Sequence, residues 1–354
     1  MFLRNFWYVA AWDHEIGREP VGYIFLNEPV VLFRRQDGTP VALEDRCAHR
    51  LLPLSKGEVL GDTIVCGYHG LTYDAAGKCI HIPGQADIPS WAVVKAYPVV
   101  ERYKCIWIWM GDPALADPAT ITDLHWADDP GWGAKDRRLV NCHYQLISDN
   151  LGDLSHLSYV HAERPGKPRS NIGTTKIAEA GEIETKVKGD NVVITRWTID
   201  ESPPSAYRRS SGFNSNVDRW QISDFSPPAF FKLNFGVAPT GTGVREGKRA
   251  RNQWSFQVCQ WATPETERTT HYFWGCAHNF GPDRDPATAA GFFNETMPKV
   301  IAEDVAVIEA QQRSIDLDPA VPRHPIKADE AVLAAQQVVA RLLAEEAKAN
   351  LRKP

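Results

Sequence analysis

The most constraining feature of this sequence is a pair of short segments that each place a cysteine close to a histidine. The first is Cys47-Ala48-His49 and the second is Cys66-Gly67-Tyr68-His69, with residues 50–65 between them. Thiolates and imidazoles both bind transition metals, and such short spacings let two tight loops aim their ligands at one point. The sequence therefore predicts a metal site built from two loops.

Two kinds of metal site use four ligands of these types. Structural zinc sites commonly pair Cys with Cys and His with His. A Rieske-type [2Fe–2S] cluster instead needs two cysteines on one iron and two histidines on the other. The mixed pairs favour the Rieske cluster, with Cys47 and Cys66 on one iron and His49 and His69 on the other. Neutral imidazoles raise its potential, which suits a cluster that passes an electron to an oxygen-activating metal.

The composition is that of a globular protein long enough for two domains. The chain has 354 residues, of which 43% are hydrophobic and 23% charged. A formal net charge of −5 without a charged tail argues against nucleic-acid binding. No apolar run approaches the ~18–20 residues of a membrane span. The apolar stretch Phe6–Trp12 lacks the basic leader and cleavage site of a signal peptide. We therefore expect a cytoplasmic protein that binds neither nucleic acid nor membrane.

The cysteines outside the two pairs fit the same compartment. They are scattered, odd in number and without the spacing of a disulfide framework, so we expect buried thiols in a reducing cytosol. These residues are Cys79, Cys105, Cys142, Cys259 and Cys276.

The chain divides by pattern into an all-β part and an α+β part. Residues 1–115 contain short apolar and β-branched segments separated by turns, which predicts an all-β domain with the cluster ligands on two loops. The Pro-rich segment Gly111–Pro118 marks a linker. In residues 116–354 a helical stretch over Tyr144–Tyr159 precedes several strands. Two helices near Pro298–Ser314 and Ala328–Ala347 end the chain. This order predicts helices over an antiparallel sheet.

A second metal site is indicated in the first of these helices. On a continuous helix Asp149, Asp153 and His156 share one face, and His161 can converge on them if the helix ends near Tyr159. Two histidines and one carboxylate with open positions form the facial triad of non-haem Fe(II) oxygenases. Histidines near a helix end are often surface or capping residues, but a Rieske cluster needs an electron acceptor. We therefore interpret His156 and His161 as iron ligands.

The third ligand is less directly indicated. Asp153 is one candidate, and a later helix offers Glu303, Asp304 and Glu309. At 100° per residue Asp304 falls near the centre of an apolar stripe, Glu303 at its edge and Glu309 on the other side. A buried carboxylate is costly unless it is paired or binds a metal. We therefore favour Asp304 as the ligand, with a buried Asp304 that caps or pairs with an Arg as the alternative.

Taken together, these motifs resemble the oxygenase (alpha) components of Rieske non-haem iron aromatic oxygenases. The resemblance covers essentially the whole chain and is greatest for the branch with vanillate O-demethylase, toluenesulfonate methyl-monooxygenase and dicamba O-demethylase. Two departures are Ala48, where the family usually has Pro, and Gly152, which is often larger. The matching segments are 4–11, Cys66-Gly67-Tyr68-His69-Gly70-Leu71, 97–102, 149–156, Val217-Asp218-Arg219-Trp220-Gln221-Ile222, 263–267 and Glu303-Asp304.

The resemblance implies a helix-grip (START-like) catalytic domain, with His156, His161 and Asp304 on a mononuclear Fe(II). It implies a homotrimer in which one chain's cluster feeds its neighbour's iron. Asp153 then matches an aspartate that bridges to the cluster ligand His69 across the subunit boundary, with a solvated helix acid as the alternative. Asn150 is expected near the iron without binding it. Electrons are expected from a separate NAD(P)H-dependent reductase, with or without a ferredoxin, because the chain carries no G-x-G-x-x-G fingerprint of its own.

For the substrate, the branch implies an aromatic acid with a methoxy or methyl group, as in the breakdown of aromatic compounds. Three polar residues are candidates for binding it. Lys232 and Asn234 share one strand face, and Gln260 aligns with a polar pocket position of the dicamba relative. Each of them can equally be a solvent-facing strand residue. The leading hypothesis is an O-demethylating monooxygenase. The alternatives are ring or methyl hydroxylation and, outside enzymes, a Rieske electron carrier.

Overall fold

The computed structural model describes residues 1–128, 132–162, 170–173, 182–248, 250, 252–278 and 292–351. It divides into two compact units. One comprises Met1–Asp128, Thr263–Arg268 and the C-terminal end from Lys348, and the other comprises Asp129–Ala262 and Thr269–Ala347. The domain boundary at residues 115/116 stays a prediction. No helix in the described part of the chain is long and apolar enough to cross a membrane.

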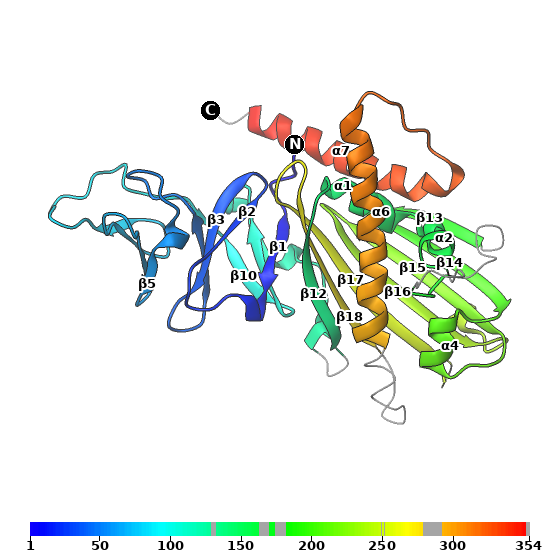
Figure 1. The fold of residues 1–354 in the computed structure, drawn as a ribbon. Coiled ribbons are helices and arrows are strands. Elements are labelled where there is room, and N and C mark those ends of the chain that lie inside the picture. Colours follow the sequence, from blue (N-terminus) through cyan, green and yellow to red (C-terminus); the bar gives the residue numbers. More distant parts are fainter. Residues whose placement is uncertain are drawn as a thin grey trace. The chain divides into compact units, whose positions relative to one another are not determined.

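The first unit contains three small antiparallel sheets (Figure 1). Their strand orders are β1-β11-β10, β2-β3-β4-β9 and β5-β6-β7-β8. The predicted strands correspond to β2, β3, β4 and β11, with ends that differ by a few residues. The strands are β1 (Trp7–Trp12), β2 (Val21–Phe25), β3 (Glu28–Arg34), β4 (Pro40–Glu44), β5 (Glu58–Leu60), β6 (Thr63–Val65), β7 (Thr72–Tyr73), β8 (Cys79–His81), β9 (Ala96–Tyr97), β10 (Val99–Arg102) and β11 (Cys105–Trp109).

Between two of these sheets lies an apolar core that includes the two cluster cysteines. Val31, Phe33 and Leu43 from β3 and β4 pack with Ile64 and Tyr73 from β6 and β7, and Cys47 and Cys66 belong to the same cluster of buried residues. The alternation of side chains along a strand places these apolar groups on one face. The loops that carry the cysteines are thus anchored in the core.

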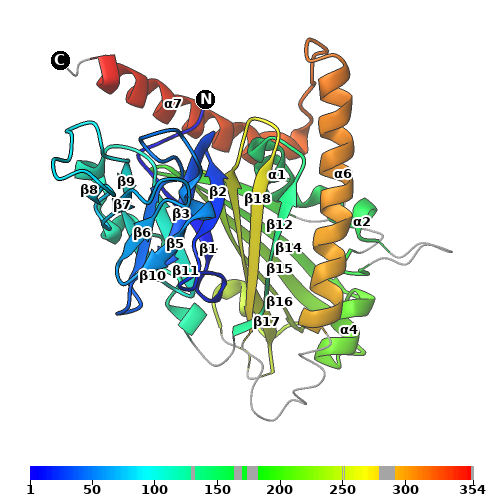
Figure 2. The same cartoon turned by 60° about the vertical axis from the view of Figure 1, so that its left-hand side comes forward.

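The second unit is built on a seven-stranded sheet with the order β12-β18-β17-β16-β15-β14-β13. Helices α1 and α6 lie over one face of it (Figures 1 and 2). The strands are β12 (Trp132–Val140), β13 (Glu182–Lys188), β14 (Asn191–Glu201), β15 (Val217–Ser226), β16 (Phe230–Pro239), β17 (Trp254–Pro264) and β18 (Thr270–His278). The helices are α1 (Tyr144–Gly152), α2 (Leu157–Val160), α4 (Ser205–Ser211), α6 (Met297–Leu317) and α7 (Glu330–Leu351).

One hydrogen bond identifies the sheet face that the helices cover. Ser223 Oγ in β15 donates to the carbonyl oxygen of Leu151 in α1 over 3.3 Å. Residues directly opposite each other on antiparallel strands share a face, so Leu233, which pairs with Ser223, also faces α1. We call this side of the sheet the helix face.

The predicted continuous helix over Tyr144–Tyr159 is wrong in one respect, because the structure breaks it at Asp153. Helix α1 ends at Gly152, and Asp153 is extended with φ −113° and ψ 100°. A short 3₁₀ turn, η6 (Leu154–His156), and α2 follow. The Asp153 carboxylate accepts hydrogen bonds from the Ser155 amide over 2.8 Å and from Ser155 Oγ over 2.9 Å. Asp153 therefore acts as an N-cap, and it competes with continuation of the helix.

Both predicted C-terminal helices are present and longer than expected. On α6, buried Val300, Ile301 and Ile308 flank Asp304, which is itself only 4% exposed. Val307 of the same helix is 45% exposed and lies outside this buried stripe. The buried stripe thus has Asp304 at its centre.

Candidate metal centres

The two loops of the Cys/His pairs have the same backbone design. In the first loop the Cys47 amide donates to Leu52 O over 2.9 Å, and the Leu51 amide donates back to Cys47 O over 2.9 Å. In the second, the Cys66 amide donates to Leu71 O over 2.8 Å, and the Gly70 amide donates to Cys66 O over 3.0 Å. Each loop is thereby closed on itself, with its cysteine at the closing point.

The four proposed ligands on these loops differ in how deeply they are buried. Cys47 and Cys66 are each 2% exposed, whereas His49 and His69 are exposed. The two imidazole rings lie side by side with their centroids 4.6 Å apart. Burial raises the pKa of the Cys66 thiol, and the neighbouring Cys47 raises it further. A pair of neighbouring thiols and a pair of neighbouring imidazoles on these two loops fit a metal cluster, which would displace the thiol protons.

Tyr73 is a residue of this site that the sequence analysis missed. Its hydroxyl lies 3.3 Å from Cys47 Sγ and accepts a hydrogen bond from the Ala48 amide over 3.1 Å. Because the amide uses a lone pair of the hydroxyl oxygen, the hydroxyl proton can be donated to the sulfur. Its position in the sequence, just after the second loop and within β7, is the feature that could have identified it.

The second site arises from the break at Asp153. The carbonyl oxygen of Asp153 accepts a hydrogen bond from His156 Nδ1 over 2.6 Å, which leaves Nε2 of that ring as the free ligand atom. Helix α2 then turns the chain so that His161, fully buried, faces His156, with ring centroids 5.4 Å apart. This convergence was expected if the helix ended near Tyr159.

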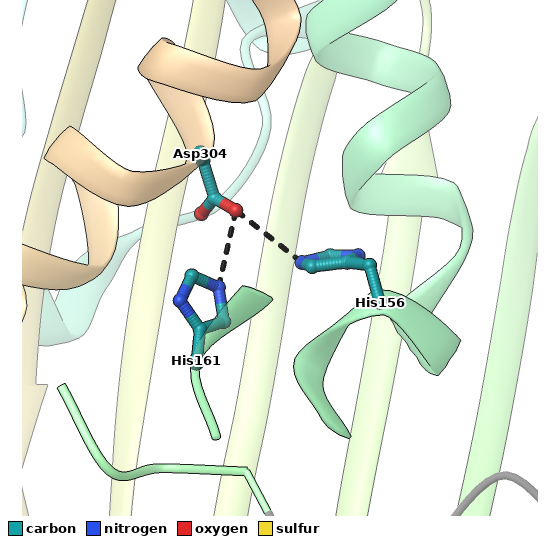
Figure 3. Close-up of side chains that lie close together, drawn as sticks. All are labelled: His156, His161 and Asp304. Carbon is teal, nitrogen blue, oxygen red and sulfur yellow. Dashed lines mark ion pairs between the residues drawn. The ribbon is translucent and has the colours of Figure 1, made fainter. Parts of the chain in front are cut away.

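Three side chains converge at this point from elements far apart in the sequence. Asp304 Oδ1, from α6, lies 3.1 Å from His161 Nε2 and 3.4 Å from His156 Nε2 (Figure 3). One ligand atom from each residue lies within 4.8 Å of the others. Two imidazoles and one carboxylate are the ligand set of a facial triad.

The charges at this site are strongly coupled. Burial disfavours the charged form of His161, but the carboxylates of Asp304 and Glu303 outweigh it and raise the pKa of His161 to about 9. Burial also disfavours ionised Asp304, yet His161 and His156 outweigh this and hold the pKa of that carboxyl well below its usual range. The carboxylate is thus ionised and ready to bind a cation.

One buried nitrogen tests whether the triad fits a metal. His161 Nε2 lies 3.1 Å from Asp304 Oδ1, but among the described residues it makes no hydrogen bond of normal geometry. A buried polar atom without a partner is costly, and a metal ion at this point would remove the cost. Asn150 Nδ2 donates to Asp304 Oδ1 over 3.4 Å. Asn150 therefore holds the carboxylate from the side, consistent with its predicted place beside the iron.

The predicted substrate residues fall on opposite faces of the sheet. Gln260 pairs with Phe231, which is two residues from Leu233, and so lies on the helix face. It is 6% exposed and accepts a hydrogen bond from the hydroxyl of Tyr272. Tyr272 is close enough to Asp304 for that carboxylate to help raise its pKa after burial, the main cause. Gln260 and Tyr272 thus lie on the side of the iron triad.

Lys232 and Asn234 do not lie on the helix face. This corrects the prediction that made them candidates for binding the substrate. They alternate with Leu233 and therefore point away from the helices. Lys232 Nζ is 3.9 Å from Asp224 Oδ2, and Asn234 Oδ1 accepts a hydrogen bond from Trp220 Nε1 over 2.6 Å. Both have structural partners on the far face.

Comparison with known families agrees with this arrangement. Residues 6–98 match the Rieske [2Fe-2S] domain, and residues 140–345 match the vanillate O-demethylase oxygenase C-terminal domain. The chain belongs to the vanillate O-demethylase oxygenase family. This membership confirms the predicted family and the predicted α+β architecture, and it makes the chain the oxygenase component of a Rieske-type oxygenase.

Full-length relatives of this oxygenase family are similar over almost the whole chain. The iron-sulfur subunit of the toluene-4-sulfonate monooxygenase system from Comamonas testosteroni is 41% identical over 98% of both chains. The vanillate O-demethylase oxygenase subunit from Pseudomonas sp. (strain HR199 / DSM 7063) is 38% identical over 99% of this chain and 97% of the relative.

Solved structures of dicamba monooxygenase share the fold of this oxygenase. The complex with dicamba matches with a TM-score of 0.86 and 33% identity over 98% of this chain and 99% of the other. A structure of that enzyme with non-haem iron and dicamba matches with a TM-score of 0.80. The Rieske domain match and the geometry of the His/Asp triad thus support both predicted cofactors, a Rieske [2Fe–2S] cluster and a mononuclear iron.

Proposed function

We propose that this oxygenase removes a methyl group from an aromatic methyl ether that carries an acid group. Hydroxylation of the methyl carbon uses O2, two electrons and two protons, and gives a hemiacetal and water. The hemiacetal then breaks its C–O bond to release a phenol and formaldehyde. The observation that carries the proposal is the His156/His161/Asp304 triad, located within the segment that matches the vanillate O-demethylase domain.

The protein's own residues have distinct tasks in this proposal. Cys47, Cys66, His49 and His69 hold the cluster, and His156, His161 and Asp304 hold the iron. When bound, the cluster supplies single electrons, and the iron activates O2 beside the substrate. The Asp153 carbonyl orients His156, and Asn150 steadies the Asp304 carboxylate through its 3.4 Å hydrogen bond.

The exposed edge of the cluster site indicates how electrons reach the iron. Because His49 and His69 face solvent while the cysteines are buried, electrons leave the first unit through the histidines. A homotrimer in which His69 of one chain contacts Asp153 of the next supplies such a path, with Asp153 as the bridging residue. A separate NAD(P)H-dependent reductase, directly or through a ferredoxin, reduces the cluster.

The substrate is proposed to bind over the helix face near Gln260. The Gln260 side chain, held by the Tyr272 hydroxyl, offers its amide group to a polar ring substituent. Lys232 and Asn234 have no part in this binding because they lie on the other face of the sheet.

Methyl hydroxylation without demethylation is the second candidate. It is favoured by the 41% identity to the toluene-4-sulfonate monooxygenase subunit. It would give a stable benzylic alcohol, because no ether bond is present to break.

A single-turnover experiment distinguishes these reactions. The iron-loaded protein is reduced chemically and mixed with O2 and a panel of methoxylated benzoates, toluenesulfonate and toluate. Formaldehyde and a phenol in equal amounts are expected from a methoxybenzoate. An alcohol without formaldehyde would identify methyl hydroxylation, a ring-hydroxylated product would identify ring oxidation, and absence of mononuclear iron would support an electron carrier.

A further inference from the structure

A carboxylate lies directly behind one of the proposed iron ligands. Glu303 Oε2 accepts a hydrogen bond from His161 Nδ1 over 2.6 Å, on the side of the ring opposite to Asp304. Neighbouring residues of α6 thus contact the two nitrogens of a single imidazole. Asp304 faces Nε2, the metal-binding atom, and Glu303 faces Nδ1.

The position of Glu303 is itself fixed by a residue from another segment. The Ser170 amide donates to Glu303 Oε1 and Ser170 Oγ donates to Oε2, each over 2.9 Å. Ser170 is 2% exposed, and the Glu303 side chain is 13% exposed. Both carboxylate oxygens therefore have defined donors in a place with little water, where such bonds orient strongly.

We propose that Glu303 is a positioning residue for the mononuclear iron, a role that rests on the proposed function of the triad. A carboxylate accepts hydrogen bonds but donates none when ionised, so it holds the proton of His161 on Nδ1. In the neutral ring, Nε2 is then the unprotonated, ligating atom, and the hydrogen bond from Nδ1 fixes the orientation of the ring. Carboxylates behind metal-bound histidines raise the basicity of the ligand and typically contribute 10–100-fold to metal affinity.

The substitution Glu303→Gln is a sharp test because it keeps the shape of the side chain. An amide has one acceptor and one donor group, whereas His161 and the Ser170 amide both donate. Whichever way the amide turns, one donor faces another donor. The matched control is Glu309→Gln on the same helix. Among the residues that the structure describes, Glu309 accepts hydrogen bonds from Asn141 alone, over 3.0 and 2.9 Å.

The measurement is Co²⁺ binding to the triad of the cluster-containing protein, followed by titration and by the ligand-field absorption of the bound metal. We expect Glu303→Gln to weaken Co²⁺ binding about 10–100-fold and to shift the absorption bands. Ser170→Ala should weaken binding less, and Glu309→Gln should match the unmodified protein. The visible absorption of the cluster reports that each variant is folded.

Wild-type affinity and an unchanged spectrum in Glu303→Gln would overturn the proposal. If that variant does not fold, Ser170→Ala decides, because it removes one partner of Glu303 and leaves the carboxylate and the ligands intact. Binding by Ser170→Ala that equals that of Glu309→Gln would then overturn it. Failure of the proposed function gives a different result, in which the unmodified protein binds no more Co²⁺ than Asp304→Asn.

Discussion

Leu51 and Gly70 occupy equivalent positions in the two cluster loops, each four residues after its cysteine, and both have a positive φ, 61° for Leu51 and 74° for Gly70. In each case the amide of this residue closes the loop on the cysteine carbonyl. Only glycine adopts this conformation without strain. The first loop therefore carries backbone strain that the second avoids.

This relationship predicts unequal results for substitutions in the two loops. Leu51→Gly should change the free energy of unfolding by less than about 1 kcal/mol, because relief of strain offsets the entropy of glycine and the lost leucine contacts. Gly70→Ala should destabilise by about 1–3 kcal/mol, since its Cβ would lie 2.9 Å from Pro83 Cγ. Loss of cluster absorbance in urea measures both. Equal effects would contradict the difference in backbone strain between the two loops.

Asp304→Asn should remove the mononuclear iron and leave the cluster in place. The amide keeps the shape of the side chain but not the charge that balances His161, only 3.1 Å away. Turnover should fall below detection, with iron analysis showing loss of the mononuclear site alone. Visible absorption of the cluster is the internal control, and an active variant would remove Asp304 from the ligand set.

The pKa of His161, raised to about 9, predicts how pH acts on the triad in metal-free protein. This histidine stabilises the fold fully below its ordinary pKa of 6.5, and the contribution is lost as pH rises through about 9. Asp304 acts in the opposite sense. Because its pKa is lowered in the fold, its carboxylate stabilises the fold above its ordinary pKa of 3.8, and this contribution is lost in acid.

Metal must displace the His161 proton, so the apparent affinity for metal should rise ~tenfold per pH unit up to about 9. Thermal melting and metal titration from pH 6 to 10 measure the two effects, and a pH-independent affinity would contradict this assignment.

Gln260→Leu should weaken substrate binding by about five- to tenfold, the value of one neutral hydrogen bond in a buried site. The substitution also removes the acceptor for the Tyr272 hydroxyl on the helix face. Steady-state KM for the substrate found in single turnover is the measurement. Lys232→Ala is the control, because its side chain points to the other face of the sheet, and its KM should not change.

Tyr73→Phe should lower the reduction potential of the cluster. Its hydroxyl lies 3.3 Å from Cys47 Sγ, and a hydrogen bond to a ligand sulfur withdraws electron density and favours the reduced form. Redox titration measures the shift. Tyr103→Phe, which removes a hydroxyl bonded to Asp123 over 2.9 Å, should leave the potential unchanged.

The sequence could predict those features that depend on residues close together in the chain. The cluster pairs, the two-unit fold type and the C-terminal helices depend on short motifs and on periodicity, and these appear in the structure. The edge strands β12 and β13 were missed because both are rich in charged residues, such as Lys135 and Lys186, which obscure the apolar alternation of a strand.

Other features depend on contacts that a linear pattern does not contain. The break at Asp153 is set by the side-chain cap on Ser155, which competes with a helix that the periodicity alone supports. Lys232 and Asn234 stood as candidates for the pocket, with a solvent-facing position as the alternative, because alternation identifies two faces but not which one the helices cover. The contact of Glu303 with His161 joins residues 142 positions apart.

The interruption of α1 gives Asp153 two structural tasks at once. Its carbonyl oxygen orients His156, and its carboxylate starts the turn that carries that histidine. If the same carboxylate also contacts a cluster histidine of another chain, any movement at that contact is transmitted to the iron ligand through a single residue. In the proposed trimer, the state of the cluster would thus bear on the position of an iron ligand.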